Sequence, residues 1–397
     1  MRRVAAGLLV LALAVGPVAL APAAVAAPAA AAPAVACPGQ EAPPPPAAPE
    51  ETGAPAAQPV PDPALGGLEA CGDVVAGGAV VPPEVGAAAF VLADLDTGAV
   101  LAARAPHARH RPASTIKVLL ALVALRALDP DLVVDGTAED LVIDGSRAGL
   151  GPGGRYTVRE LLAGLLLNSG NDAAAALSRA LGGDPVTVAA MDRAADALGA
   201  LDTRPATPSG LDGPGGATSA YDLVLLFRAA LRDPLFAQTI TLESVPFPGY
   251  GDMPGFTLSN SSRFLGRYPG ALGGKTGFTE AARHTFVGAA ERDGRRLVVA
   301  VVRGEQAPVP MTAQVAALLD LGFALPPGTA PVGELVDGPP APPPTTAVPV
   351  PPAAAPAPAP APGGGPSGSA LALAAVAGAA LGVTGLVTAR TLRRRRG

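Results

Sequence analysis

The stretch PASTIKVLLAL, residues 112–122, places a serine and a lysine three positions apart at the start of an apolar run. On a helix, residues three apart share a face, so the Lys117 ammonium can reach the Ser114 hydroxyl. A serine becomes a strong nucleophile only when a base takes its proton. A lysine can be that base where burial or a nearby cation stabilises its neutral form. The stretch therefore predicts a serine nucleophile with a lysine base, although a helix-capping serine beside a surface lysine would give the same pattern.

Two further polar motifs lie downstream. Ser169 and Asn171 belong to a Ser-Gly-Asn sequence between two expected helices, where a loop can direct a hydroxyl and an amide into a cleft. In acyl transfer such groups pass a proton to the leaving amine and hold the substrate backbone. Lys275, Thr276 and Gly277 precede a hairpin, where they would supply a cation, a hydroxyl for a substrate carboxylate and room for the substrate backbone. Each motif alone is also ordinary turn chemistry.

The order and spacing of the three motifs are more specific than any one of them. Ser169 follows Ser114 by about 55 residues, and Lys275 follows Ser169 by about 106. In this order they resemble the motifs of low-molecular-mass penicillin-binding proteins of the serine D-alanyl-D-alanine carboxypeptidase family. The likeness extends to residues 168–173, 207–213 and 270–279.

This resemblance covers about residues 82–326 and implies a penicillin-sensitive acyl-enzyme on Ser114. The substrate would be peptidoglycan stem peptides, β-lactam antibiotics would be covalent inhibitors, and no cofactor or metal is implied. The backbone N–H groups of Ser114 and Phe278 would form an oxyanion hole. Some relatives bind the terminal carboxylate with an arginine about thirty-five residues after the lysine of Lys-Thr-Gly. This chain has no clear counterpart, so the carboxylate contact beyond Thr276 is unassigned.

Alternating apolar residues predict hairpins at both ends of the 82–326 segment. Residues 89–102 form one such pattern and residues 285–302 the other. Strands at both ends with helices between them predict an α+β fold, in which an antiparallel sheet is sandwiched by helices and a mostly helical region is inserted. The resemblance specifies the β-lactamase/transpeptidase type. Helices are expected over residues 115–128, 157–167, 171–181, 185–198, 219–231 and 310–321.

Hydrophobic segments near both ends of the chain have the character of targeting signals. Residues 1–27 combine two arginines, an apolar run and an A-x-A site, as in a secretory signal peptide, and an uncleaved anchor is the alternative. Residues 369–389 carry no charge and can span a bilayer. The basic residues 390–397 would stay cytoplasmic by the positive-inside rule. We therefore expect an exported protein, anchored in the cell membrane by its C-terminal helix, with the catalytic domain extracytoplasmic; a sorting tail cleaved after export is the other interpretation.

Two segments rich in proline and alanine, residues 28–81 and 327–368, flank the expected catalytic domain. Many of the 47 prolines and 49 glycines lie there, and such composition favours extended spacers. A spacer that crosses the cell wall and simple disorder are compatible interpretations. Cys37 and Cys71 are the only cysteines, and in an oxidising compartment they predict one disulfide.

Composition also weighs against other function classes. The net charge is -5 and basic residues gather only at the C-terminus, which argues against nucleic-acid binding. The histidines are scattered along the chain, so the sequence predicts neither a metal site nor a Ser-His-Asp hydrolase. His107 and His110, which flank Arg109 and Arg111 in a polar segment, are expected to face solvent.

Two alternatives on the same fold remain. One is a class A-type β-lactamase, which would need a glutamate to activate water. The chain has no glutamate between Glu160 and Glu243, although an aspartate such as Asp212 could substitute. The other is a non-catalytic wall-binding protein, which would have no need for all four of Ser114, Lys117, Ser169 and Lys275.

Overall fold

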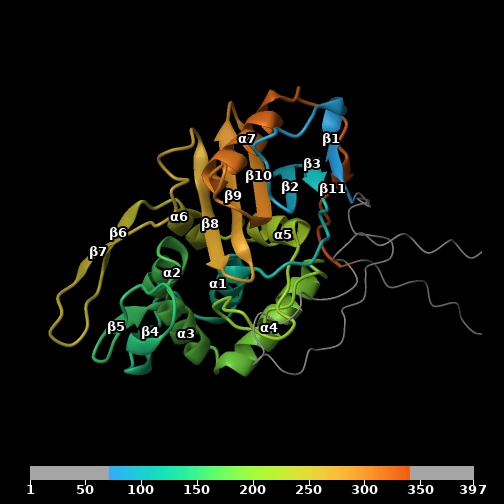
Figure 1. Ribbon diagram of the computed structural model, residues 1–397. Coiled ribbons are helices and arrows are strands. Elements are labelled where there is room, and N and C mark those ends of the chain that lie inside the picture. The colour runs from blue at the N-terminus through green and yellow to red at the C-terminus, as the bar shows by residue number, and fades with distance from the viewer. Residues whose placement is uncertain (1–70, 340–397) are drawn as a thin grey trace, which may run out of the picture. The chain divides into compact units, whose positions relative to one another are not determined.

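An antiparallel sheet runs through the part of the chain that the computed structural model describes, residues 71–339 (Figure 1). Its seven strands follow the order β1-β3-β2-β10-β9-β8, with β11 also paired to β3. Among the described strands β8 pairs only with β9, so its other edge is open to border a cleft. The strands are β1 (Asp73–Val75), β2 (Ala89–Asp94), β3 (Ala99–Arg104), β8 (Ala271–Thr279), β9 (Arg283–Arg292), β10 (Arg295–Gly304) and β11 (Gly333–Glu334).

Successive residues of the central strands face opposite sides of the sheet, and helices cover both sides. On β2, Phe90 and Leu92 belong to the core beneath α7 (Met311–Ala324). Val91 between them belongs to the core that contains α5 (Ala220–Ala230). All three strand side chains are fully buried. The predicted antiparallel sheet sandwiched by helices is therefore confirmed.

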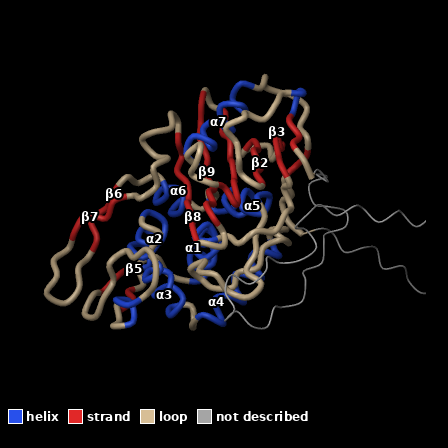
Figure 2. The backbone as a smooth tube through the Cα atoms, in the orientation of Figure 1, coloured by secondary structure: helices blue, strands red, loops and turns tan. Residues whose placement is uncertain are grey.

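Between β3 and β8 the chain builds a mostly helical region, which lies at one end of the sheet in Figure 2. Two small hairpins, β4 with β5 and β6 with β7, belong to this region. Its elements besides α5 are η3 (Ala113–Ile116), α1 (Lys117–Ala127), β4 (Val133–Asp135), η4 (Glu139–Val142), β5 (Arg155–Thr157), α2 (Val158–Leu167), α3 (Asn171–Ala180), α4 (Asp184–Ala197), α6 (Pro234–Ile240), β6 (Ser244–Phe247) and β7 (Phe256–Ser259).

The six predicted helices are all present, with ends displaced by at most three residues. The start of α2 is fixed by a capping box, in which Thr157 and Glu160 each accept the other's backbone N–H through their side chains. The sequence does not predict α6, because its seven residues are too few to show a helical period. It does not predict β6 either, since Pro246 ordinarily argues against a strand.

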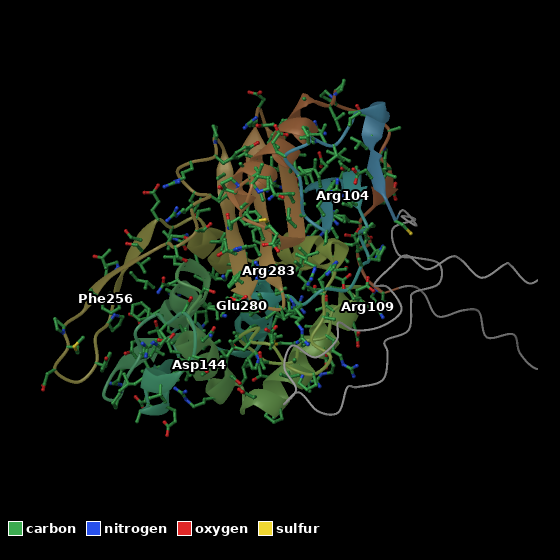
Figure 3. The ribbon with its side chains drawn as sticks, in the orientation of Figure 1. Arg104, Arg109, Asp144, Phe256, Glu280 and Arg283 are labelled. Carbon is green, nitrogen blue, oxygen red and sulfur yellow. The ribbon has the colours of Figure 1, made fainter. Side chains whose placement is uncertain are left out.

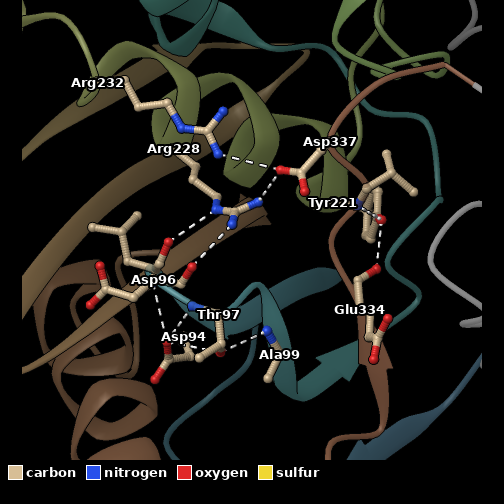
Figure 4. A network of polar contacts seen from close by, with 11 residues as sticks. Asp94, Asp96, Thr97, Ala99, Tyr221, Arg228, Arg232, Glu334 and Asp337 are labelled. Carbon is tan, nitrogen blue, oxygen red and sulfur yellow. Dashed lines mark hydrogen bonds and ion pairs between the residues drawn. The ribbon is translucent and has the colours of Figure 1, made fainter.

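The sheet reaches beyond residues 82–326 on both sides, because β1 and β11 both pair with β3. The segment that contains β11 is also tied to α5 (Figure 4). The Tyr221 hydroxyl donates to the Glu334 carbonyl oxygen at 2.8 Å, and Arg228 forms a 3.0 Å ion pair with Asp337. These contacts join the last described residues to the catalytic fold rather than to the spacer.

Several predictions concern residues that lie outside the described range. The signal peptide, the membrane span and the basic tail (residues 1–27, 369–389 and 390–397) belong to this group. So does Cys37, and its disulfide with Cys71 stays a prediction. Within residues 71–339, no helix is both long enough and apolar enough to cross a bilayer.

The prediction that the segment around His107 and Arg109 faces solvent is wrong. Both side chains are only 3% exposed, and Asp202 lies between them. Its Oδ2 is 2.9 Å from His107 Nδ1, and its Oδ1 accepts from Arg109 Nε at 3.0 Å (Arg109 is labelled in Figure 3). The polar segment is thus an internal charge cluster that anchors the chain leading to Ser114.

We expect Asp202→Asn to lower the free energy of unfolding by about 3–5 kcal/mol, because it removes one partner of a buried charge cluster. Urea unfolding followed by circular dichroism measures this loss. Asp337→Asn is the matched control, since that carboxylate is 76% exposed and should contribute less than about 1 kcal/mol. Equal effects of the two substitutions would contradict an anchoring role for the cluster.

Candidate active site

Ser114 lies in η3, a single turn that leads directly into α1. Two glycines allow neighbouring segments to approach this turn. A Cβ on Gly277 would lie 2.8 Å from the Ser114 nitrogen, and one on Gly210 would lie 2.0 Å from the Ala113 carbonyl oxygen. Side chains do not tolerate such distances, so both positions need glycine. Ala113 itself has a φ of 47°, a strained value that the packing around the serine maintains.

Lys117 is fully buried and reaches three acceptors. Its Nζ donates to Ser114 Oγ at 2.8 Å, to Asn171 Oδ1 at 2.7 Å and to the carbonyl oxygen of Ser209. Burial, together with the charge of Lys275, holds the pKa of Lys117 well below its usual value. This shift favours the neutral amine, which is the form that can accept the Ser114 proton.

Ser169 and Lys275 form a second hydroxyl–ammonium pair. Lys275 Nζ donates to Ser169 Oγ at 2.9 Å and to the Thr276 carbonyl oxygen at 2.6 Å. Burial lowers the pKa of Lys275 to about 7, so its protonated and neutral forms coexist near neutral pH. Ser169 has a φ of 58°, and this left-handed conformation lies between α2 and α3. Such a pair can pass a proton to a leaving group.

The side chain of Asn171 is held on both sides. Its Oδ1 accepts from Lys117, and its Nδ2 donates to the Asp144 carbonyl oxygen at 2.6 Å (Asp144 is labelled in Figure 3). The neighbouring Asp172 carboxylate accepts the backbone N–H groups of residues 148–150 and so fixes the facing loop. An amide group has two N–H bonds, so one remains to bind a ligand in the cleft.

A cleft of about 840 Å³ opens over these groups. His284 also lines it, and its ring lies 4.5 Å from that of Phe278. Lys117 and Lys275 are buried behind the two serines with which they form hydrogen bonds. The predicted site residues that line the cleft are Ser114, Ser169, Asn171, Thr276, Gly277 and Phe278.

This arrangement suits acyl transfer through a serine. It joins a hydroxyl to a buried amine base, places a second hydroxyl–amine pair nearby, and brings the backbone of an edge strand to the same cleft. No three His, Cys, Asp or Glu side chains within residues 71–339 are placed to hold a metal ion.

Comparison with known proteins identifies the family. The family model described as D-alanyl-D-alanine carboxypeptidase, peptidase S11, matches residues 77–306. The chain belongs to this family. The match contains all three motifs of this carboxypeptidase.

Curated relatives and solved structures agree with the assignment. The carboxypeptidase is 52% identical over 268 residues to D-alanyl-D-alanine carboxypeptidase DacB2 of Mycobacterium tuberculosis, an alignment that covers 66% of this chain and 91% of the relative. It is 36% identical to DacD of Salmonella typhimurium over 61% of this chain and 64% of that protein. A crystal structure of D-alanyl-D-alanine carboxypeptidase from M. tuberculosis matches with a TM-score of 0.63 and 50% identity, over 66% of this chain and all of that one. The DD-transpeptidase of Streptomyces K15 matches with a TM-score of 0.59 and 27% identity, over 62% of this chain and all of that one.

Sequence reasoning missed two parts of the site in this carboxypeptidase. The Ser209 carbonyl oxygen accepts a hydrogen bond from Lys117, and Gly210 packs against the turn that carries Ser114. Both belong to the 207–213 stretch, which carries part of the family likeness. The likeness marked that stretch but gave it no role, because its contacts join residues about 90 positions apart.

Proposed function

We propose that this chain releases the C-terminal D-alanine of peptidoglycan stem peptides through an acyl-enzyme on Ser114. The 2.8 Å hydrogen bond between Lys117 Nζ and Ser114 Oγ carries the proposal, because it joins the nucleophile to a fully buried base. Membership of the D-alanyl-D-alanine carboxypeptidase family supports it.

Acylation begins when Lys117 takes the Ser114 proton and Ser114 Oγ attacks the carbonyl carbon of the penultimate D-alanine. The carbonyl oxygen becomes an oxyanion, which the backbone N–H groups of Ser114 and Phe278 stabilise. The C–N bond then breaks. Ser169 gives a proton to the amine of the departing D-alanine and receives a proton from Lys275.

Substrate contacts come from the cleft walls. Thr276 offers a hydroxyl for the substrate carboxylate, and the missing side chain of Gly277 lets the substrate backbone approach β8. The free N–H of the Asn171 amide binds the acyl part of the peptide. Water then attacks the ester carbonyl carbon, the bond from that carbon to Ser114 Oγ breaks, and Lys117 returns the proton to Ser114 Oγ, which frees Ser114 and the shortened peptide.

The placement of Asp212 argues against rapid hydrolysis of a penicilloyl ester. The Asp212 carboxylate accepts from the Thr279 hydroxyl at 3.1 Å and lies 3.8 Å from an Arg111 nitrogen. It is engaged in these contacts and is not among the residues that line the cleft over Ser114. Among the described residues, no carboxylate lines this cleft to activate water for β-lactam hydrolysis, so penicillin should inhibit the enzyme rather than be consumed.

We further propose that the catalytic domain works outside the cytoplasm, tethered to the cell membrane. The signal-like residues 1–27 and the apolar residues 369–389 with their basic tail support this location. Peptidoglycan substrates are found on that side of the membrane. Protease treatment of intact cells that removes the catalytic domain while the cell membrane stays closed would support the location, and protection of the domain would contradict it.

Benzylpenicillin distinguishes a carboxypeptidase from a β-lactamase. We expect the full chain to form a covalent adduct that intact-mass measurements still detect after hours, and to release D-alanine from a D-Ala-D-Ala peptide when penicillin is absent. Asp212→Asn should leave the adduct lifetime unchanged. Rapid loss of the adduct with accumulation of hydrolysed drug, and a longer lifetime in Asp212→Asn, would instead establish a β-lactamase.

A further inference from the structure

Two arginines that have no partner among residues 71–339 line the active-site cleft. Arg263 and Arg267 are both exposed, and within the described residues neither guanidinium forms a hydrogen bond or an ion pair. Arg283 (labelled in Figure 3) is different, because its guanidinium forms ion pairs with Glu305 and Glu280. Unpaired cations at a substrate cleft are available to bind an anionic group of the substrate.

The charge of the residues that line the cleft also favours an anionic ligand. Within the described part of the chain, no aspartate or glutamate lines the cleft, although the whole chain carries a net charge of -5. The first turn of the fourteen-residue helix α7 also reaches the cleft and contains no acidic residue, so its positive end adds to the effect of the arginines. The cleft is therefore suited to an anion.

The two arginines belong to a short segment that is fixed at several points. Both the backbone N–H and the hydroxyl of Ser261 donate to the Leu167 carbonyl oxygen, at 2.8 and 2.9 Å. The ring of Phe264 packs on that of Phe286 at 5.2 Å, and Tyr268 donates to Asp320 at 2.9 Å. These contacts hold the backbone of residues 261–268, which carries the exposed side chains of Arg263 and Arg267.

Residues 261–268 are linked to the segments that carry Ser169 and Thr276. Leu167, to which Ser261 is bonded, is two residues from Ser169, the proposed proton donor to the departing amine. Phe286, against which Phe264 packs, is the register partner of Thr276 on β8. Arg263 thus lies between Ser261 and Phe264 in the chain, and it lines the same cleft as Ser169 and Thr276.

We propose that Arg263 and Arg267 bind the terminal carboxylate of the departing D-alanine and so restrict cleavage to the end of the peptide. The inference rests on the proposed acyl-enzyme mechanism and identifies the carboxylate contact beyond Thr276. The position thirty-five residues after Lys275, where some relatives carry an arginine, is Pro310 in this chain, and Pro310 lines the same cleft. The cations therefore come from a different segment here.

The test compares kcat/KM for N-acyl-L-Lys-D-Ala-D-Ala and for the same peptide with a C-terminal amide. We expect Arg263→Gln and Arg267→Gln together to lower kcat/KM for the free acid by about 10- to 100-fold, the loss typical of charge-assisted hydrogen bonds, with little change for the amide. Arg263→Lys keeps a positive charge and should therefore retain more activity on the free acid than Arg263→Gln does. Arg126→Gln, at an exposed arginine on α1 away from the cleft, is the control for loss of one positive charge.

Unchanged kcat/KM for the acid, or equal losses on both peptides, would overturn the assignment. Should the amide be cleaved too slowly to follow, an N-acyl-D-alanyl thioglycolate and its methyl ester provide the same pair on a more reactive leaving group. Failure of the mechanism itself is recognised separately, because Ser114→Ala would then retain activity on every one of these substrates.

Discussion

Ser114→Ala should lower kcat/KM for D-alanine release by roughly 10⁴- to 10⁶-fold, since loss of a catalytic nucleophile removes the covalent route altogether. The substitution deletes only one oxygen from a partly exposed turn, so the fold should keep its thermal stability. Release of D-alanine from a D-Ala-D-Ala peptide measures the effect, and circular dichroism checks the fold.

Ser169→Ala is the matched control for this experiment. It also removes a hydroxyl bound to a buried lysine in the same cleft, but leaves the nucleophile in place. We expect a smaller loss, about 10²- to 10⁴-fold, as for removal of a group that only assists proton transfer. A Ser169→Ala loss that exceeds the Ser114→Ala loss would mean that the two roles are assigned the wrong way round.

Removal of the base should have the second largest effect. Lys117→Arg introduces a group that does not lose its proton and so cannot act as the base, and acylation by benzylpenicillin should slow by roughly 10³-fold or more. In the wild type the acylation rate should rise with pH as Lys117 loses its proton, because only the neutral amine can act as base. Stopped-flow or quenched-flow acylation rates measure both effects.

Lys117→Ala separates the loss of the base from the effect of a bulky replacement. It should also acylate slowly, and it should lack the rise with pH that the wild type owes to Lys117. An Arg or Ala variant that acylates within tenfold of the wild type would show that another group takes the Ser114 proton.

The sequence predicts the local parts of the site well. Ser114 and Lys117 are three residues apart, and their hydrogen bond depends only on the geometry of one turn. Ser169 and Lys275 are 106 residues apart, and only the family likeness placed them together before the structure did. The order of motifs thus carried long-range information that periodicity alone lacks.

Contacts without a sequence signal could not be predicted. Nothing around His107 shows that Asp202, 95 residues later, lies beside it, so a polar segment was expected at the surface and is buried instead. Strands β1 and β11 have three and two residues, too few to show alternation, and only their pairing with β3 reveals them. Arg263 and Arg267 stand out only once the cleft and the absence of described partners are seen.

The most direct measurement is peptide mapping of the penicilloyl adduct. The full chain is treated with benzylpenicillin, digested, and sequenced by tandem mass spectrometry to locate the added mass. We predict that the drug is attached to Ser114 alone. Attachment to Ser169 or to any other residue would contradict the central assignment, as would a failure to form any adduct under conditions in which D-alanine is released.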